Sequence, residues 1–194
     1  MFTGIITDIG RIEEISKRND LKLTIKTNFS HADLSIGSSV ACSGPCLTIV
    51  DSKENFFSVE VSNETISKTN ITSWSEGSLI NLEKGLKVGD EIGGHFVTGH
   101  IDGTIKLLHK KQDAGSIILT FQQNKELQKY LAPKGSVTID GVSLTINDSN
   151  KNDFTVNIID HTQKKTTLGS IDIGQLANIE VDMFARYIYQ MNNN

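Results

Sequence analysis

The chain contains an internal repeat, and this feature limits the possible folds more than any other. Residues Ser39–Thr48 align with Ser136–Thr145 at an offset of 97 positions. The same offset pairs Phe57 with Phe154, Thr65 with Thr162, Lys68 with Lys165, Asn81 with Asn178 and Glu83 with Glu180. Near the start of each half, Thr3-Gly4 aligns with Thr98-Gly99 at an offset of 95. Each half is therefore expected to fold as one structural unit.

The hydrophobic pattern within each half predicts short β-strands. Leu21, Leu23 and Ile25 alternate with polar residues, which is the period of a strand with one buried face. In the second half, apolar residues flank Asp140-Gly141, a dipeptide that favours a two-residue hairpin turn. About six such strands in roughly 90 residues leave no open edge only if the sheet closes. We therefore expect a mainly β fold of two similar six-stranded closed β-barrels.

Two segments carry a helical pattern. Asn124 can cap a helix that runs to Leu131 and ends before Pro133, so a helix is predicted there. In the tail, four apolar residues recur with the spacing of one helical face: Phe184, Tyr187, Ile188 and Met191. A helix of about ten residues is marginal alone in water. Its apolar face must therefore pack against the barrels or against the same helix of another subunit.

These patterns divide the chain into three parts. The predicted boundaries are residues 1–92 for the N-terminal barrel, 93–182 for the C-terminal barrel and 183–194 for the C-terminal helix. The composition, 37% apolar and 22% charged over 194 residues, is typical of a soluble globular protein. It rules out a disordered chain and a disulfide scaffold.

Charge and hydropathy exclude further classes of protein. The net charge is −4 and no block of five like charges occurs, so a nucleic-acid partner is not expected. No apolar run approaches the roughly 18 residues of a membrane span, and Met1–Gly10 lacks the pattern of a signal peptide. Cys42 and Cys46 are the only cysteines, which is too few for a disulfide framework. A reducing cytoplasm is the predicted location, without a membrane partner.

The candidate chemistry gathers around the repeat. Residues 93–103 contain four glycines, His95, His100 and Asp102, yet their spacing matches no recognisable zinc array, and no metal is expected. A lone histidine most often has a structural role, but two histidines beside glycines raise the chance of an acid or base role. Cys46 is a candidate nucleophile, and its repeat partner is Ser143. The alternative is turn and strand chemistry alone. The duplicated pair favours two related pockets for one kind of small polar ligand.

At these residues the chain resembles the riboflavin synthases of the α-chain type. The resemblance rests on Met1–Ile6, Ser39–Thr48, Gly93–His100 and Gly135–Thr145, and it covers essentially the whole chain. It implies two similar β-barrels, a homotrimer held by the C-terminal helices, and dismutation of two 6,7-dimethyl-8-ribityllumazine molecules. One lumazine would give four carbons to the other, yielding riboflavin and 5-amino-6-ribitylaminouracil. That chemistry requires no metal or redox cofactor, and association with lumazine synthase stays open.

The resemblance also implies the site residues. Effects on the rate are expected from His100, Cys46, Ser143, Ser39 and Asp182. The lumazine of the first barrel is expected to contact Gly4, Ile5, Ile6, Ser39, Cys46, Thr48, Thr65, Gly99 and His100. The second barrel is expected to offer Lys134, Ser143, Thr145, Ile159 and Thr162. Further contacts are expected from Leu47, Glu60, Ser62, Ile101 and Leu144. A base must deprotonate the C7 methyl of one lumazine while a nucleophile adds at C7 of the other, and the sequence leaves these roles unassigned.

One departure and two alternatives remain. Many members of the family have Asn-Gly-Val where this chain has Ser43-Gly44-Pro45, and Pro45 lacks a backbone donor. A stiffer or slightly shifted turn is therefore expected before Cys46. The main alternative function is a non-catalytic lumazine or flavin carrier of the lumazine-protein type, which would need no second working site. The other is a purely structural β-barrel module, which would not explain the Gly-His segments.

Overall fold

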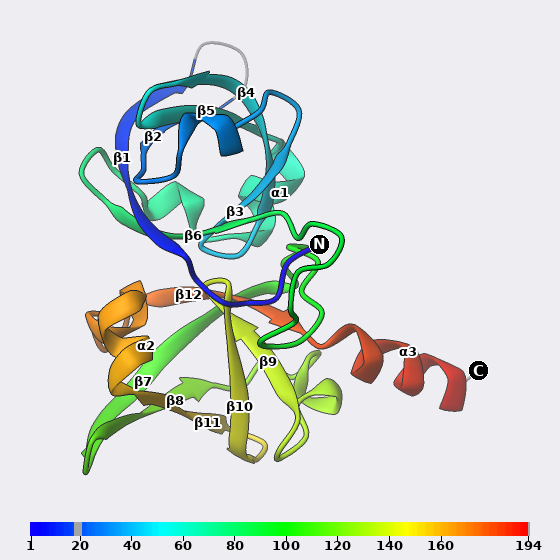
Figure 1. The fold of residues 1–194 in the computed structure, drawn as a ribbon. Coiled ribbons are helices and arrows are strands. Elements are labelled where there is room, and N and C mark those ends of the chain that lie inside the picture. Colours follow the sequence, from blue (N-terminus) through cyan, green and yellow to red (C-terminus); the bar gives the residue numbers. More distant parts are fainter. Residues whose placement is uncertain (18–20, 194) are drawn as a thin grey trace.

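The chain folds into two β-barrels and a C-terminal helix, as the repeat predicted. The computed structural model describes residues 1–17 and 21–193. Figure 1 shows one barrel above the other, with the last helix, α3 (Met183–Asn192), extending away to one side. Asn194, the last residue of the predicted helical segment, lies outside the described residues. The fold class is therefore mainly β, with each repeat forming one closed barrel.

Each barrel is closed by six antiparallel strands. The first contains β1 (Asp8–Lys17), β2 (Leu21–Lys26), β3 (Ser39–Cys42), β4 (Cys46–Lys53), β5 (Phe56–Val61) and β6 (Leu79–Lys84). The second contains β7 (Gly103–Asp113), β8 (Ser116–Gln122), β9 (Ser136–Ile139), β10 (Val142–Ser149), β11 (Asp153–Ile159) and β12 (Leu176–Val181). The ring order is β1-β2-β5-β4-β3-β6 in the first barrel, and the corresponding strands follow the same order in the second.

Bulges at equivalent places bend the strands so that the sheets can close. In the first barrel the register shifts between Ile12 and Glu14 and between Ile49 and Asp51. The second barrel has its shifts at the repeat partners, after Leu107 and after Ile146. Such bulges add local twist and curvature to a strand. Each sheet can therefore close, and every described strand has a neighbouring strand on both sides.

The predicted alternation of apolar residues is confirmed. Leu23 and Ile25 are fully buried and pack in the core of the first barrel. The core of the second barrel contains Val137 and Ile146, among others. Burying one face of each strand in this way supplies most of the favourable free energy of such a fold.

The short helices are where the sequence predictions differ most from the structure. The predicted helix Asn124–Leu131 is wrong: only the 3-10 turn η3 (Gln128–Tyr130) forms there. Asn124 Oδ1 accepts a hydrogen bond from Glu126 N (2.9 Å), which makes a tight turn instead. Leu131 is buried at the end of the barrel. The apolar residues of this segment, Leu127 and Leu131, therefore pack into the core of the second barrel and do not form one face of a helix.

The remaining helical segments were not predicted, and they again come in equivalent pairs. α1 (Asn63–Lys68) follows β5, and α2 (Asp160–Lys165) follows β11. The 3-10 turns η1 (His31–Asp33), η2 (Ile71–Ser73) and η4 (Thr167–Gly169) complete the set. Among residues 1–17 and 21–193, no helix has the length and apolar character that crossing a membrane requires.

Two asparagines fasten the barrels to each other reciprocally. Asn81 of the first barrel donates from Nδ2 to Asp140 O of the second (2.8 Å). Asn178, its repeat partner, donates from Nδ2 to Ser43 O of the first barrel (2.8 Å). Both asparagines are fully buried, so every such polar group must find a partner within the interface. The two halves are therefore related by an approximate twofold arrangement.

Candidate active site

Two arms precede the barrels and lie side by side between them. We call residues 1–7 the first arm and residues 93–102 the second arm, because each leads into the first strand of its own half. Phe2 N donates to Val97 O (2.7 Å) and Val97 N donates to Phe2 O (3.0 Å), which joins the arms as a short antiparallel bridge. From this bridge each arm continues to the barrel of the other half.

A glycine of each arm lies directly on the opposite barrel. Ser143 N donates to Gly4 O (2.8 Å), and Cys46 N donates to Gly99 O (2.9 Å). Both glycines have positive φ, +77° and +78°, and a Cβ at either position would lie 2.5 Å from the Cβ of the residue beneath it. Only glycine combines this conformation with such close approach. The arms therefore cross: the first completes the surface of the second barrel, and the second completes that of the first.

The second arm and the first barrel enclose a pocket of about 300 Å³. We call it the first pocket; it is lined by Pro45, Cys46, Glu64, Thr65, Lys68, Thr69, Gly99, His100 and Ile101. Five of these residues were predicted to contact the substrate: Cys46, Thr65, Gly99, His100 and Ile101. The pocket combines a thiol, an imidazole and an ammonium group with a backbone arm held close to the barrel. Such a mixture suits a small polar heterocycle.

The other residues predicted for the first barrel lie at different distances from this pocket. Ser39 and Thr48 are directly opposite each other on β3 and β4, on the same face as Cys46. The Leu47 side chain is buried in the barrel core and faces away from them. Ser62 caps α1, because its Oγ accepts a hydrogen bond from Thr65 N (3.2 Å). Ser62 thus positions Thr65 at the pocket.

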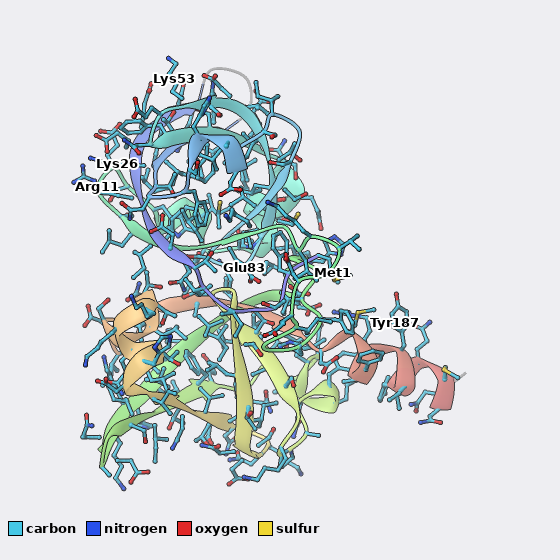
Figure 2. The ribbon with its side chains drawn as sticks, in the orientation of Figure 1. Met1, Arg11, Lys26, Lys53, Glu83 and Tyr187 are labelled. Atoms are coloured by element: carbon cyan, nitrogen blue, oxygen red, sulfur yellow. The ribbon has the colours of Figure 1, made fainter. Side chains whose placement is uncertain are left out.

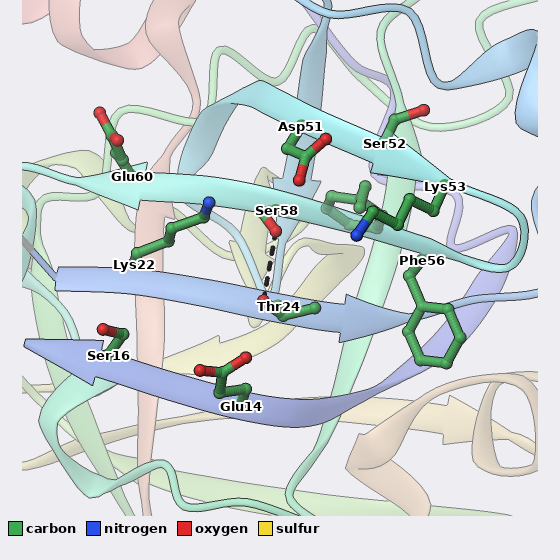
Figure 3. Close-up of a pocket in the computed structure, with 11 residues that line it drawn as sticks. Glu14, Ser16, Lys22, Thr24, Asp51, Ser52, Lys53, Phe56, Ser58 and Glu60 are labelled. Carbon is green, nitrogen blue, oxygen red and sulfur yellow. Dashed lines mark hydrogen bonds between the residues drawn. The ribbon is translucent and has the colours of Figure 1, made fainter.

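Glu60 is not brought to the first pocket. It lines a different hollow of about 630 Å³ on the outside of the first barrel (Figure 3). The labelled side chains there come from strands β1, β2, β4 and β5, and Thr24 and Ser58 are hydrogen-bonded through their hydroxyl groups (3.2 Å). Lysines and carboxylates are mixed across this hollow. Of the predicted site residues, Glu60 alone lines it.

The face of the second barrel that corresponds to the first pocket in the repeat carries Ser143 and Thr145 on one face of β10, and we name it the second pocket by that equivalence alone. They are paired with Thr138 and Ser136 of β9. Leu144 between them is buried in the core. Ile159 is 60% exposed at the end of β11, just before α2.

Two further residues predicted for the second barrel lie on its turns and helices. Thr162 lies in α2, where its carbonyl accepts the hydroxyl proton of Thr166 (2.7 Å). Lys134 has φ +68° in the turn before β9, and its N–H donates to Ile146 O (2.7 Å). Its backbone is thereby fixed to β10, the strand that contains Ser143.

His95 belongs to the second pocket and was not among the residues assigned by the resemblance. Its Nδ1 lies 2.7 Å from Ser143 Oγ, and its Nε2 lies 3.1 Å from Thr138 Oγ1. Burial lowers the pKa of His95, while the negative charge of Asp182 acts in the opposite direction. Asp182 also caps α3 by accepting a hydrogen bond from Phe184 N (2.9 Å). The available signal was the pair of glycines directly before His95.

Two expectations about the site need correction. Gly4, Ile5 and Ile6 were assigned to the first barrel, but the crossing of the arms places them on the second: Gly4 lies on Ser143, and Ile6 packs against the second core. The sequence places them in the first half, and nothing local to them signals the crossing. The turn before Cys46 is also not shifted by Pro45. Both barrels have the same two-residue turn at this point, and Cys42 N donates to Pro45 O (3.0 Å).

Four residues that line the first pocket were not among the predicted contacts: Pro45, Glu64, Lys68 and Thr69. Two of them carried a visible signal, because Lys68 and Thr69 pair with Lys165 and Thr166 in the repeat. Their place on a six-residue helix and the turn after it concealed the connection to Cys46. Within residues 1–17 and 21–193, no group of three or more histidine, cysteine or acidic side chains is arranged to hold a metal.

Comparison with known proteins identifies the family. The model of the lumazine binding domain matches twice, at residues 3–85 and 98–182. The chain is 43% identical over 193 residues to the riboflavin synthase of Brucella abortus (strain 2308), covering 96% of each chain. It is 38% identical over 191 residues to that of Bacillus subtilis (strain 168), covering 98% of this chain and 89% of the relative.

Solved structures show the same fold at lower identity. LumP complexed with 6,7-dimethyl-8-(1'-D-ribityl) lumazine superposes with a TM-score of 0.80, and LumP complexed with riboflavin with 0.83. Both are 23% identical to this chain and cover 93% of it and 99% of LumP. The two riboflavin synthases, by contrast, are 43% and 38% identical to this chain. The duplicated lumazine-binding barrels and this similarity over nearly the full length show that the chain belongs to the riboflavin synthase family of enzymes.

Proposed function

We propose that the chain binds 6,7-dimethyl-8-ribityllumazine in each of its two equivalent pockets, and that a four-carbon unit passes between two molecules held in facing pockets, the first pocket of one subunit and the second pocket of the next. The main support for this proposal is the crossing of the arms. The same arrangement occurs twice, with the backbone of Gly99 against Cys46 and the backbone of Gly4 against Ser143. A reaction between two copies of one molecule needs two similar sites. Holding both copies in register supplies a large part of the acceleration through proximity.

The two pockets differ in chemistry, and the difference suggests their roles. In the second pocket, burial keeps His95 neutral at neutral pH, so it can accept the hydroxyl proton of Ser143. Ser143, or a water molecule that it holds, then adds at C7 of the lumazine in this pocket. The negative charge of Asp182 favours the imidazolium that results.

The first pocket suits the lumazine that loses a proton from its C7 methyl group. His100 and Cys46 line this pocket and are the candidate bases. The ammonium group of Lys68 lies in the same lining and would stabilise the lumazine anion that forms. Proton removal in one pocket and addition in the other leave the two molecules ready to join.

The test is to incubate the purified protein with 6,7-dimethyl-8-ribityllumazine and to follow riboflavin by absorbance and fluorescence. One riboflavin for every two lumazines consumed is the expected result. Binding of lumazine without riboflavin formation would instead support the carrier function, for which the likeness to LumP is the relevant observation. Absence of both binding and product would contradict the proposal as a whole.

We also propose that α3 joins the chain into a homotrimer. Phe184, Tyr187, Ile188 and Met191 are 55%, 58%, 58% and 80% exposed in the single chain. The opposite side of the helix is held in place, because Arg186 pairs with Asp102 and Tyr189 packs edge-on against Tyr130 at 5.4 Å. A fixed helix with a bare apolar face favours packing against another copy. In that assembly, the first pocket of one subunit would face the second pocket of the next.

Two finer points stay predictions. One is the division of the chain into units at residues 92 and 182, which assigns the first arm to the first unit although its Gly4 lies on the second barrel. The other is association with lumazine synthase, which the resemblance leaves open and which co-sedimentation of the two purified proteins would test.

A further inference from the structure

Two buried carboxylates occupy equivalent positions in the two barrels. Glu83 lies in β6 and Glu180 in β12, 97 positions apart. Their residues are only 5% and 4% exposed. Figure 2 shows Glu83 at the level where the barrels meet, close to the N-terminal segment. Burying a carboxylate destabilises the folded state unless hydrogen bonds compensate for the lost hydration. The hydrogen-bond partners of Glu83 and Glu180 therefore indicate what the two side chains do.

Each carboxylate binds the arm of its own half through three hydrogen bonds. Glu83 accepts from Thr3 N (2.7 Å), Thr3 Oγ1 (2.8 Å) and Gly4 N (2.9 Å). Glu180 accepts from Thr98 N (2.7 Å), Thr98 Oγ1 (2.7 Å) and Gly99 N (2.9 Å). The two sets match atom for atom. Hydrogen bonds to a charged acceptor are the stronger kind, so each carboxylate fixes its Thr-Gly pair firmly.

The threonines extend this hold by one more residue. Thr98 Oγ1 accepts from His100 N, and Thr3 Oγ1 accepts from Ile5 N, each at 3.3 Å. Glu180 therefore orders the backbone as far as His100, which lines the first pocket. Glu83 orders the backbone as far as Ile5, next to the glycine on Ser143.

We propose that Glu83 and Glu180 are positioning residues that act crosswise: Glu180 of the second barrel sets the first pocket, and Glu83 of the first barrel sets the second. The proposal rests on the two-pocket function above. It follows from the path of each arm: a carboxylate of the arm's own barrel holds its Thr-Gly pair, and the glycine of that pair lies on the opposite barrel. Glu180 does not line the first pocket, so it would act through the arm. Glu83 lines a separate hollow of about 500 Å³ beside its own arm, together with Thr3, Ile5 and Gly93.

The two cysteines provide a probe that reports on the first pocket alone. Cys46 lies beneath Gly99, whereas Cys42 is fully buried in the core of the first barrel. An alkylating reagent such as iodoacetamide should therefore label Cys46, and mass spectrometry identifies which thiol reacted. The second arm covers Cys46, so the rate of alkylation measures how firmly Gly99 is held.

The matched variants are Glu180→Gln and Glu83→Gln. Glutamine keeps the size of the side chain but turns an NH2 group toward a backbone N–H, so at least one hydrogen bond to a charged acceptor is lost. We expect Cys46 in Glu180→Gln to be alkylated on the order of tenfold faster than in the wild type, which is the factor that one such bond implies. Glu83→Gln should react at the wild-type rate. Riboflavin formation should fall in both variants, because the reaction needs both pockets.

A milder pair guards against loss of the fold. Thr98→Val and Thr3→Val each remove one hydroxyl from the same two clusters, and Thr98→Val alone should accelerate alkylation of Cys46, by a smaller factor. Equal alkylation rates within both pairs would overturn the crosswise proposal, as would full activity of Glu180→Gln. The alkylation is measured without ligand, so it is independent of the proposed function. If the wild type makes no riboflavin while the alkylation rates still differ, the function fails and the positioning stands.

Discussion

At the scale of single residues, the second arm depends on a glycine for two separate reasons. Gly99 has φ +78°, and a Cβ there would lie 2.5 Å from Cys46 Cβ. Gly99→Ala should therefore displace the arm from the first pocket and lower riboflavin formation at least tenfold. Gly89→Ala is the control, because Gly89 has φ +97° but nothing within 4 Å of the added carbon. It should cost about 1 kcal/mol of stability from backbone strain. Steady-state kinetics and thermal unfolding of both variants distinguish close approach from strain, and equal activities would contradict this account.

Cys46 is the residue for which chemistry and packing can be separated most simply. Its side chain lines the first pocket and does not belong to the fully buried core. Cys46→Ala should lower turnover strongly, while the free energy of unfolding changes by about 1 kcal/mol or less. Turnover with saturating lumazine and urea unfolding are the two measurements. Wild-type turnover in this variant would remove Cys46 from the mechanism.

Asp140 introduces a pH dependence at the interface of the barrels. Its carboxylate accepts a hydrogen bond from Asn178 N (2.8 Å), and burial raises its pKa to about 7 from an ordinary value of 3.8. Between these values the folded state binds more protons than the unfolded state. Stability therefore falls as pH rises through this window.

The repeat offers a neutral replacement for Asp140, because its partner in the first barrel is Ser43. It occupies the equivalent turn position, with φ +49° against +45°, and its Oγ accepts from Asn81 N (3.0 Å). Between pH 5 and pH 8 the melting temperature should fall less in Asp140→Ser than in the wild type. The difference should be roughly 2–4 °C for each kcal/mol of pH-dependent stability that the substitution removes. Calorimetry at the two pH values measures this directly. Parallel behaviour of variant and wild type would show that Asp140 is not the group responsible.

At the scale of elements, the sequence predicted long-range regularity better than short helices. The alternation around Leu23 and the turn Asp140-Gly141 led to the strands and their hairpin, because a period of two and a turn dipeptide are local signals. The six-residue helices α1 and α2 are too short to show a period. The contact of Gly4 with Ser143 joins residues far apart in the chain and leaves no local pattern at all. The two pockets were therefore predictable as a pair, but the arm that completes each was not.

The capping of α1 gives a prediction at this scale. Ser62 accepts from Thr65 N, whereas α2 begins after Ile159 without a side-chain cap. Ser62→Ala should cost about 1 kcal/mol of stability. It should also raise the KM for lumazine, because Thr65 lines the first pocket. Thermal unfolding and kinetics measure the two effects, and an unchanged KM would show that the start of α1 does not position Thr65.

At the scale of the whole molecule, the proposed trimer depends on the apolar face of α3. Ile188 is 58% exposed and stands on the same face as Tyr187, which points away from the barrels in Figure 2. Ile188→Glu should leave the melting of the single chain nearly unchanged while it breaks the trimer and lowers activity. Gln190→Glu adds the same charge at another exposed position of the helix and should leave assembly intact. Sedimentation velocity distinguishes the two variants, and a trimeric, active Ile188→Glu protein would contradict the role of this face.

The crossed arms also bear on how such a molecule can arise. The arm of each half contacts the barrel of the other half. Two protomers of a domain-swapped symmetric dimer exchange an element in the same way. A chain with one such barrel could satisfy the same contacts only by pairing with a second copy of itself. Joining two copies end to end makes that partnership permanent, and it then allows one copy to become Cys46 where the other becomes Ser143. The duplicated chain thus resembles two different subunits joined by a peptide bond. Each of its two sites can then specialise for one half of the same reaction.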